Sequence, residues 1–206
     1  MERHAIVICG GLSRRMESDK ALIEYNGNPM LIHHVHAFLE RGWNVVVAGV
    51  DERRIDLLKG MAITTIPIEN EQGKRGPVRG ILSGLGMIPN NEWIQLSPCD
   101  APHLIDTIMD LSVMKGWEAI TMPIWRDGDE WRSEPLWASG PKDMLLHAIL
   151  EYDGPLHKRF KDAGCTEQMI ALPDPGISSL NTKKELEMVE NTIRMEGEGP
   201  SIHRET

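Results

Sequence analysis

The sequence predicts an α/β fold with a mostly parallel central sheet and a β-hairpin excursion. Short apolar runs rich in β-branched residues, such as 5–8 and 43–49, alternate with segments of helical periodicity such as 29–41. Strands that alternate with helices are joined by right-handed crossovers and pair in parallel. The excursion is expected at Arg126-Asp127-Gly128-Asp129, which is a hairpin turn signal between two strand-like runs.

Glycine, proline and capping residues mark the ends of the expected elements. Gly10-Gly11 ends the first strand, Asn28-Pro29 begins the first helix, and Gly42 ends that helix. Thr182-Lys183-Lys184-Glu185 is a capping box that begins the last helix. Between them we expect strands at 43–49, 61–66, 92–96, 118–125, 131–138 and 167–172, and helices at 51–58, 77–88, from Pro102, around 144–150 and from Pro155.

Length and composition indicate one domain over 1–193, followed by a polar tail over 194–206 that we expect to fray. A net charge of −9 argues against general nucleic-acid binding. No apolar run approaches the roughly 20 residues that span a bilayer. Cys9, Cys99 and Cys165 match no metal-binding spacing and are expected to be reduced thiols. With no signal peptide before the first strand, the expected location is the cytoplasm.

The stretch 6–20, IVICGGLSRRMESDK, has the composition of a polyphosphate-binding segment. Gly10-Gly11 permits close approach of the main chain to a ligand, and Arg14, Arg15 and Lys20 supply positive charge. Neither the P-loop pattern G-x-x-x-x-G-K-[ST] nor the dinucleotide fingerprint G-x-G-x-x-G is present here. The competing interpretation is an ordinary strand and turn with solvated cations.

The loop resembles the signature loop of nucleotidyltransferases with a Rossmann-like fold, which usually reads L-A-G-G-x-[GS]-x-R-M-G-x-D-K. The match includes Gly-Gly, Arg-Met and Asp-Lys in register, while Glu17 stands where the family normally has Gly. The resemblance implies a three-layer Rossmann-like nucleotidyltransferase fold.

Asp100 is a candidate metal ligand. It follows the expected strand 92–96 within SPCDAP, and the carboxyl ends of central parallel strands border the ligand crevice. Mg²⁺ is typically held by one or two carboxylates together with substrate phosphates. The alternative is that Asp100 only caps the helix that begins at Pro102.

Further blocks follow in the order expected for molybdenum cofactor guanylyltransferases, and the resemblance covers nearly the whole chain. They are Gly76-Pro77-Val78-Arg79-Gly80, Pro98-Cys99-Asp100-Ala101-Pro102, Glu134-Pro135-Leu136-Trp137-Ala138 and 180–186. The resemblance implies transfer of GMP from GTP to the molybdopterin-bound molybdenum cofactor, giving a guanine dinucleotide cofactor and pyrophosphate. Mg²⁺ is the implied cofactor.

The resemblance also implies roles for individual residues. Arg15 and Lys20 would stabilise the triphosphate, and Asp100 would bind Mg²⁺. Glu69 stands near a family Asp that helps to recognise guanine, and Ala48-Gly49 stands where the family has an Asn. The main chain of Ile8, Cys9, Gly10 and Gly11 would contact the nucleotide, and Lys158, Arg159 and Asn181 would face the pterin half.

Expected partners are GTP, the molybdopterin cofactor, and the molybdoenzymes that carry or accept it, with no nucleic acid and no membrane. Three alternatives remain open. One is another nucleotidyl transfer on the same fold, either CMP to molybdopterin or a nucleotide to a phosphorylated sugar or small acid. Another is a non-catalytic protein that binds nucleotide or cofactor and hands it on. The third, a dehydrogenase, is disfavoured by the missing fingerprint.

Overall fold

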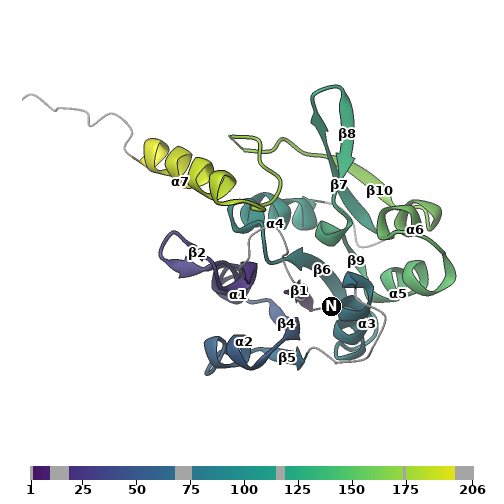
Figure 1. Cartoon of the computed structure of the whole chain (residues 1–206). Helices are drawn as coiled ribbons and strands as arrows, with labels where there is room; N and C mark the ends of the chain where they lie inside the picture. Colours follow the sequence, from purple (N-terminus) through teal and green to yellow (C-terminus); the bar gives the residue numbers. More distant parts are fainter. Residues whose placement is uncertain (1, 10–18, 68–75, 115–118, 174, 198–206) are drawn as a thin grey trace, which may run out of the picture.

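The computed structural model describes residues 2–9, 19–67, 76–114, 119–173 and 175–197 (Figure 1). Its strands are β1 Arg3–Ile8, β2 Glu24–Tyr25, β3 Asn28–Pro29, β4 Asn44–Val50, β5 Thr64–Pro67, β6 Trp93–Pro98, β7 Thr121–Asp127, β8 Glu130–Ser133, β9 Ser139–Pro141 and β10 Thr166–Met169. Its α-helices are α1 Met30–Glu40, α2 Glu52–Leu57, α3 Pro77–Gly86, α4 Ile105–Met114, α5 Lys142–Glu151, α6 Leu156–Asp162 and α7 Lys183–Gly197. Three short 3₁₀ helices are η1 Lys20–Leu22, η2 Pro102–Leu104 and η3 Pro135–Trp137.

The central sheet has the strand order β10-β7-β9-β6-β1-β4-β5, with β8 paired to β7. Strand β1 is parallel to both of its neighbours, β4 and β6. At the two edges of the sheet, β5 pairs in parallel with β4, and β10 pairs in parallel with β7. Strand β9 is antiparallel to β6 and β7, and the β7–β8 hairpin is antiparallel. The predicted mostly parallel α/β sheet with a hairpin excursion is therefore confirmed.

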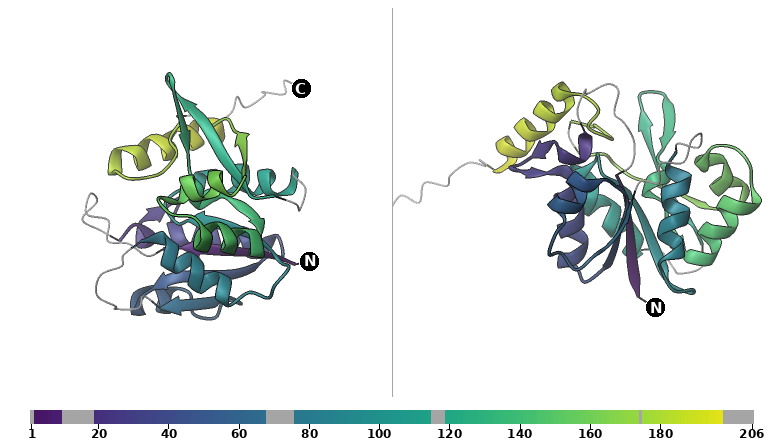
Figure 2. Two further views of the ribbon diagram at one scale, coloured as in Figure 1. Left: turned by 90° about the vertical axis from the view of Figure 1, so that its right-hand side faces the viewer. Right: turned by 60° about the horizontal axis from the view of Figure 1, so that its bottom comes forward.

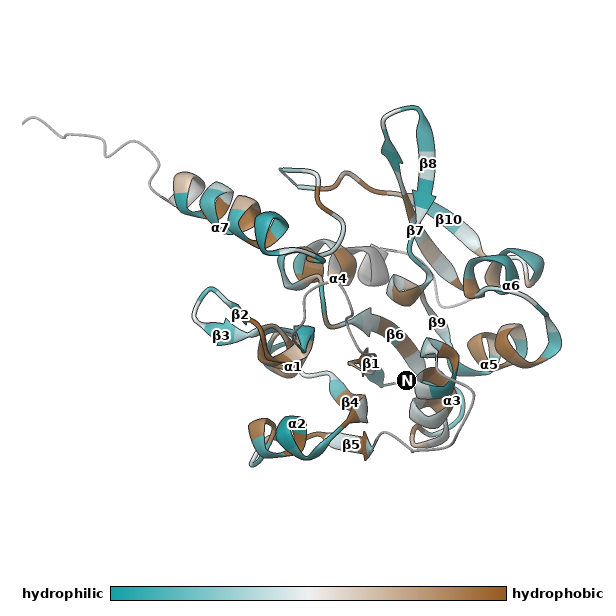
Figure 3. Ribbon diagram, viewed as in Figure 1, coloured by the Kyte–Doolittle hydropathy of each residue, from teal (hydrophilic) through white to brown (hydrophobic). Residues whose placement is uncertain are grey.

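Helices cover both faces of the sheet, as Figure 2 shows. One hydrophobic cluster joins the face of β1 that carries Ala5 and Val7 to helices α1 and α4. The other cluster joins the face that carries Ile6 and Ile8 to α3, α5 and α6. Alternate residues of a strand point to opposite faces, so a continuous apolar strand such as β1 is what a sheet covered on both sides requires. Figure 3 shows hydrophobic residues on α5 and on the inner part of β7, whereas β8 and the tip of the β7–β8 hairpin are hydrophilic.

The expected strand 131–138 is wrong in its extent. Strand β8 ends at Ser133, the chain turns through η3, and only then does β9 begin at Ser139, next to β6. Pro135 has a fixed φ and no N–H to donate to a ladder, and the Glu134 side chain accepts from Leu136 N at the start of η3 (2.9 Å). These local features stop the strand, and the chain crosses from the hairpin back into the sheet.

The start of α1 also differs from the expectation. Asn28 and Pro29 pair with β2 as strand β3, and the helix begins at Met30 with no side-chain cap. The turn of this small hairpin is Asn26-Gly27, where both residues have positive φ. Asn-Gly is the preferred type I′ hairpin turn, which explains why pairing prevails over capping here.

Helix α3 packs closely on β1 because of Gly84. A Cβ at this position would lie 2.7 Å from Ile6 Cγ2, a contact that real structures do not show. The missing side chain of Gly84 therefore lets α3 pack closely on β1. At Gly86, by contrast, a Cβ would meet nothing within 4 Å.

Helix α7 docks on the β2–β3 hairpin, away from the main sheet. Leu180 and Val189 form a cluster with Tyr25 and Met30, and Asn26 N–H donates to Glu190 (3.2 Å). The helix continues past Ile193 to Gly197, and 198–206 lie outside the described residues. Across the described chain, no helix is long and apolar enough to cross a membrane.

Candidate functional site

The site lies at the carboxyl ends of β1 and β6, the two central parallel strands. Ile8 pairs in register with Pro98, so Cys9 and Cys99 follow side by side. Cys99 N–H donates to Ile8 O (3.3 Å), and Cys9 N–H donates to Ala48 O at the end of β4 (3.0 Å). These hydrogen bonds bring the ends of three strands together. Ile8 and Cys9 were predicted to contact the nucleotide through their main chain, and the hydrogen bonds engage Ile8 O and Cys9 N–H between strand ends.

The two thiols beside the site are poor nucleophiles and poor metal ligands. Burial raises the pKa of the Cys9 thiol to about 12 and raises the pKa of Cys99 well above its usual range. The thiolate is the reactive and metal-binding form of cysteine, so both side chains remain neutral at physiological pH. All three cysteines of the chain are free thiols, as predicted.

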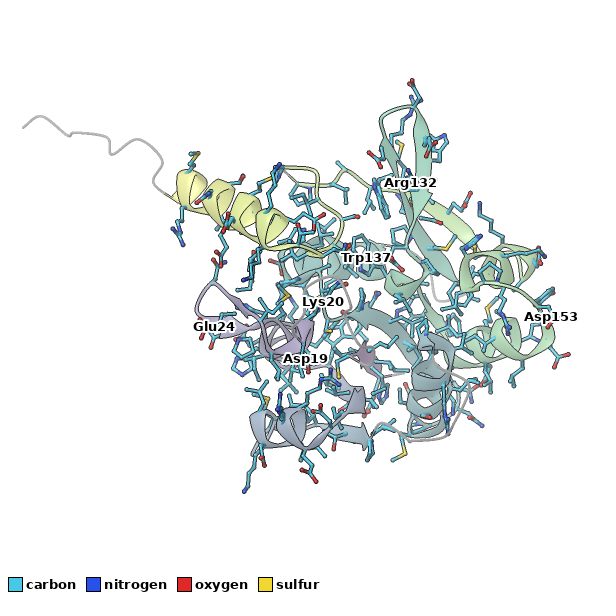
Figure 4. The ribbon with its side chains drawn as sticks, in the orientation of Figure 1. Asp19, Lys20, Glu24, Arg132, Trp137 and Asp153 are labelled. Atoms are coloured by element: carbon cyan, nitrogen blue, oxygen red, sulfur yellow. The ribbon has the colours of Figure 1, made fainter. Side chains whose placement is uncertain are left out.

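Lys20, Asp100 and Asn181 converge from three distant segments. Lys20 Nζ donates to Asp100 Oδ2 (2.8 Å) and to Asn181 Oδ1 (2.5 Å). Side-chain exposures of 17% for Lys20 and 24% for Asp100 leave the pair partly open to solvent. An ammonium has three N–H donors, and the contacts among the described residues use two of them, which leaves one for a phosphate oxygen. Figure 4 shows Lys20 near the middle of the molecule.

Asn181 is placed by hydrogen bonds on either side of it. The preceding residue, Leu180, donates its N–H to Asp100 O (2.7 Å), which fastens this segment to the chain that follows β6. Asn181 N–H donates to Glu185 (2.8 Å), and Glu185 N–H donates to Thr182 Oγ1 (3.2 Å). Thr182 and Glu185 thus cap α7 as predicted, although the glutamate accepts from Asn181 rather than from the Thr182 main chain.

Asp100 suits the kind of Mg²⁺ site in which the protein supplies only one or two of the ligands. One of its oxygens contacts Lys20, and Asp100 lies two residues beyond the end of β6. Among the described residues, no group of three or more His, Cys, Asp or Glu side chains is gathered as a metal site. A single carboxylate completed by substrate phosphates is a usual arrangement for Mg²⁺. The alternative role of Asp100 as a cap is not seen, because η2 has Ala101 in the cap position and no side-chain cap.

Glu134 is a second carboxylate near Asp100, to which the sequence assigned no role. Strands β6 and β9 are antiparallel with Gln95 opposite Ser139, so the chain that continues from β6 to Asp100 runs alongside the chain that precedes β9. Burial raises the pKa of Glu134, the Leu136 N–H lowers it, and the charge of Asp100 raises it further. The only sequence signal for it was its place in the block Glu134-Pro135-Leu136.

Lys158 and Arg159 lie on α6, in the helical layer on the far side of the sheet from α1. Lys158 pairs with Asp162 one turn along the same helix. Arg159 donates to Gly154 O (2.7 Å) and to Ile149 O, both close to the α5–α6 connection. Figure 4 labels Asp153 in that connection, at the edge of the molecule opposite α1.

The structure thus brings Asn181 to Lys20 and Asp100 but does not bring Lys158 and Arg159 there. Their assignment to the pterin half stays a prediction. The predicted site residues Gly10, Gly11, Arg15 and Glu69 lie outside the described residues.

Comparison with solved structures supports the fold. The CMP:2-keto-3-deoxy-manno-octonic acid synthetase complexed with CTP matches with a TM-score of 0.67 at 13% identity, covering 95% of this chain and 100% of that chain. A nucleotidyl transferase from Methanothermobacter matches with a TM-score of 0.67 at 17% identity, covering 94% of this chain and 99% of that chain. At such identities the likeness concerns the fold alone.

Comparison with protein sequences gives the family. A molybdenum cofactor guanylyltransferase of Pseudomonas aeruginosa is 26% identical over 182 residues, which are 86% of this chain and 89% of the relative. A probable molybdenum cofactor guanylyltransferase of Bacillus cytotoxicus is 32% identical over 102 residues, 48% of this chain and 49% of the relative. The model of the MobA-like NTP transferase domain matches residues 5–155. The chain therefore belongs to the MobA-like NTP transferase domain family and is a nucleotidyltransferase.

Proposed function

We propose that the protein transfers GMP from GTP to the molybdopterin-bound molybdenum cofactor, forming the guanine dinucleotide cofactor and pyrophosphate. The observation that carries the proposal is the convergence of Lys20, Asp100 and Asn181 at the carboxyl ends of β1 and β6. A cation with one open donor, a carboxylate and an amide suit a nucleoside triphosphate and its metal. The names of the curated relatives supply the acceptor and the base.

The chemistry is an in-line displacement at the α-phosphorus of GTP. An oxygen of the acceptor's terminal phosphate forms the new P–O bond as the bond to the pyrophosphate oxygen breaks. That phosphate is already a nucleophile, so the site needs no strong base. The chain's contribution is to position both anions and to neutralise their charge. Lys20 would bind the departing phosphates through its open N–H, while Asn181 and Asp100 hold the ammonium in place.

Asp100 would hold Mg²⁺ together with phosphate oxygens of the substrate. When bound there, Mg²⁺ would supply positive charge that orients the phosphates and offsets their negative charge. In the free protein, the Lys20 ammonium contacts the same carboxylate. Glu134 lies close enough to interact electrostatically with Asp100, so added positive charge also relieves the repulsion between these two carboxylates.

The test is product analysis by mass spectrometry. The protein is incubated with molybdopterin cofactor, Mg²⁺ and all four nucleoside triphosphates in equal amounts. The expected product is the guanine dinucleotide cofactor, formed together with pyrophosphate. The Asp100→Asn variant is run in parallel as the matched control, because it keeps the side-chain shape and removes the charge.

The same experiment separates the proposal from its alternatives. A cytosine dinucleotide cofactor as the product would mean that the protein transfers CMP. One departure from the family sequence is a specific reason to test this alternative. Ala48 and Gly49 stand where the family has an Asn, and their carbonyls accept from Cys9 and Arg54. Binding of cofactor and nucleotide without any joined product would mean a carrier. No binding of molybdopterin would leave nucleotidyl transfer to another phosphorylated acceptor.

We further propose that the reaction takes place in the cytoplasm. The three free thiols are consistent with the reducing cytoplasm. Partners that carry molybdopterin or accept the finished dinucleotide would be molybdoenzymes or their assembly proteins.

A further inference from the structure

Cys9 and Asp19, the residues on either side of segment 10–18, are both linked by hydrogen bonds to the end of β4, Cys9 directly and Asp19 through Arg54. On one side, Cys9 N–H donates to Ala48 O (3.0 Å), and the Cys9 thiol lies 3.4 Å from Ala48 O. On the other side, an Asp19 carboxylate oxygen accepts from Arg54 Nη2 (2.7 Å). Arg54 Nη1 donates to Gly49 O (2.7 Å). One guanidinium therefore ties Asp19 to β4.

Arg54 is buried although it is charged. The residue is 4% exposed, on helix α2, and its side chain is 5% exposed against 21% for Asp19. Burying a charge costs free energy unless the charge is paired and hydrogen-bonded. Among the described residues, its two Nη atoms donate to Asp19 and Gly49, whereas its buried Nε has no partner there. Gly49 has a φ of +86° that other residues rarely adopt. The arrangement is thus specific to a fork-shaped side chain, since both partners lie within reach of one planar group.

The Asp19 carboxylate joins this fork to the candidate site. The same Oδ1 that accepts from Arg54 also accepts from Ala21 N–H (3.2 Å) and caps helix η1. Lys20 is the first residue of η1, so its backbone is held between Asp19 and Ala21. Its ammonium then reaches Asp100 and Asn181.

We propose that Arg54 is a positioning residue that aims Lys20 at the triphosphate by holding Asp19. Arg54 touches neither Lys20 nor Asp100 in any hydrogen bond of the described residues, and it acts through the cap of η1. The inference rests on the proposed function, because it assigns Lys20 to the β- and γ-phosphates. Sequence reasoning missed Arg54, which stands 34 residues after Lys20 in a short helix that is otherwise largely exposed.

The experiment compares the affinities for GTP and GMP by calorimetry in Mg²⁺. The ratio of the two affinities reports contacts to the β- and γ-phosphates, whereas a loss of general stability changes both alike. Arg54→Met removes the fork and keeps the apolar stem. The matched control is Arg53→Met, which removes the same charge from an exposed position in the same helix. We expect Arg54→Met to lower the GTP-to-GMP ratio about tenfold, roughly the loss of one charge-assisted contact, and Arg53→Met to leave it unchanged.

Two further variants keep the test decisive if Arg54→Met folds poorly. Asp19→Asn retains an oxygen for Ala21 N–H and removes the charge that Arg54 pairs with, so the ratio should fall in the same direction by less. Arg54→Lys keeps the charge but offers one nitrogen in place of the two that contact Gly49 and Asp19, so rescue should be partial. Adding Asp19→Asn to Arg54→Met should lower the ratio no further, because both residues act in one unit.

The outcomes separate this inference from the proposed function. The reference is Lys20→Met in the same assay. If Lys20→Met lowers the ratio and Arg54→Met leaves it at the wild-type value while lowering only the melting temperature, Arg54 is merely structural and the inference is overturned. If Lys20→Met itself leaves the ratio unchanged, the assignment of Lys20 within the proposed function is wrong.

Discussion

Replacement of Lys20 by Met tests the centre of the proposed site. Methionine keeps an unbranched apolar stem and removes the ammonium that joins Asp100 to Asn181. A hydrogen bond to a charged group contributes about 1.5–3 kcal/mol. Because about 1.4 kcal/mol corresponds to a factor of ten in affinity, the variant should bind GTP about 10–150-fold more weakly. GMP, which lacks the β- and γ-phosphates, should lose much less.

The stability of this variant can also be worked out from the structure. An exposed ion pair contributes about 0–1 kcal/mol, whereas breaking a buried pair costs about 3–5 kcal/mol. The Lys20–Asp100 pair is neither, with side chains 17% and 24% exposed. We therefore expect Lys20→Met to lower the free energy of unfolding by about 1–2 kcal/mol, between these two limits.

Calorimetric titration of GTP and GMP and denaturant unfolding measure the two quantities. Lys184→Met is the matched control, because it removes the same charge at an exposed position three residues beyond Asn181. It should leave both affinities and the stability near wild type. Equal losses of GTP and GMP affinity in Lys20→Met would refute the reasoning, since the lost contact would then not be to the terminal phosphates.

Three further predictions concern the other charged residues. Asp100→Asn should lower turnover in Mg²⁺ on the order of 10²–10³-fold with an unchanged circular dichroism spectrum, and activity within a few-fold of wild type would contradict a metal role. Glu134 has a raised pKa, mainly through burial, so its favourable contribution to stability is complete below the ordinary value of 4.5 and is lost as pH rises through the folded-state pKa. Glu134→Gln keeps an acceptor for the N–H at the start of η3 and should therefore raise the free energy of unfolding at pH 7 but not below pH 4.5, as measured by denaturant unfolding at both pH values; equal effects at both would rule out the charge as the cause. Replacing Lys158 and Arg159 together by Ala should raise the KM for the molybdopterin cofactor and leave GTP affinity unchanged in steady-state kinetics, and loss of GTP binding alone would reverse this assignment.

The local sequence predicted the fold class because short-range patterns carry it. The apolar run of β1, the alternation of strands with helices and the turn signal at 126–129 follow from side-chain period and turn chemistry. The place of Asp100 at the carboxyl end of β6 follows as well, since the position of a residue along a strand is a local property. The predicted strand 131–138 was wrong in its extent, because it ran through Pro135, where the chain leaves the strand.

The candidate site was predictable only in part, for a physical reason. Lys20 and Asp100 could be singled out from their motifs, but their 2.8 Å contact could not. Asn181 was assigned to the pterin half, yet the hydrogen bond from Leu180 to Asp100 carries it to the Lys20 ammonium. Such pairing depends on how distant segments pack, and no local pattern in one chain encodes it.

By itself the sequence determined the α/β class, most of the alternation of strands and helices along the chain, and the cation and carboxylate that suit a triphosphate. The tertiary structure alone decided which side chains meet. It buried Arg54 against Asp19 and set Glu134 beside Asp100, while Lys158 and Arg159 have partners in α6, in α5 and in the loop between them. Side-chain period and turn chemistry act over a few residues, whereas the pairing of charges is settled by which strand ends and helices the packed sheet brings together.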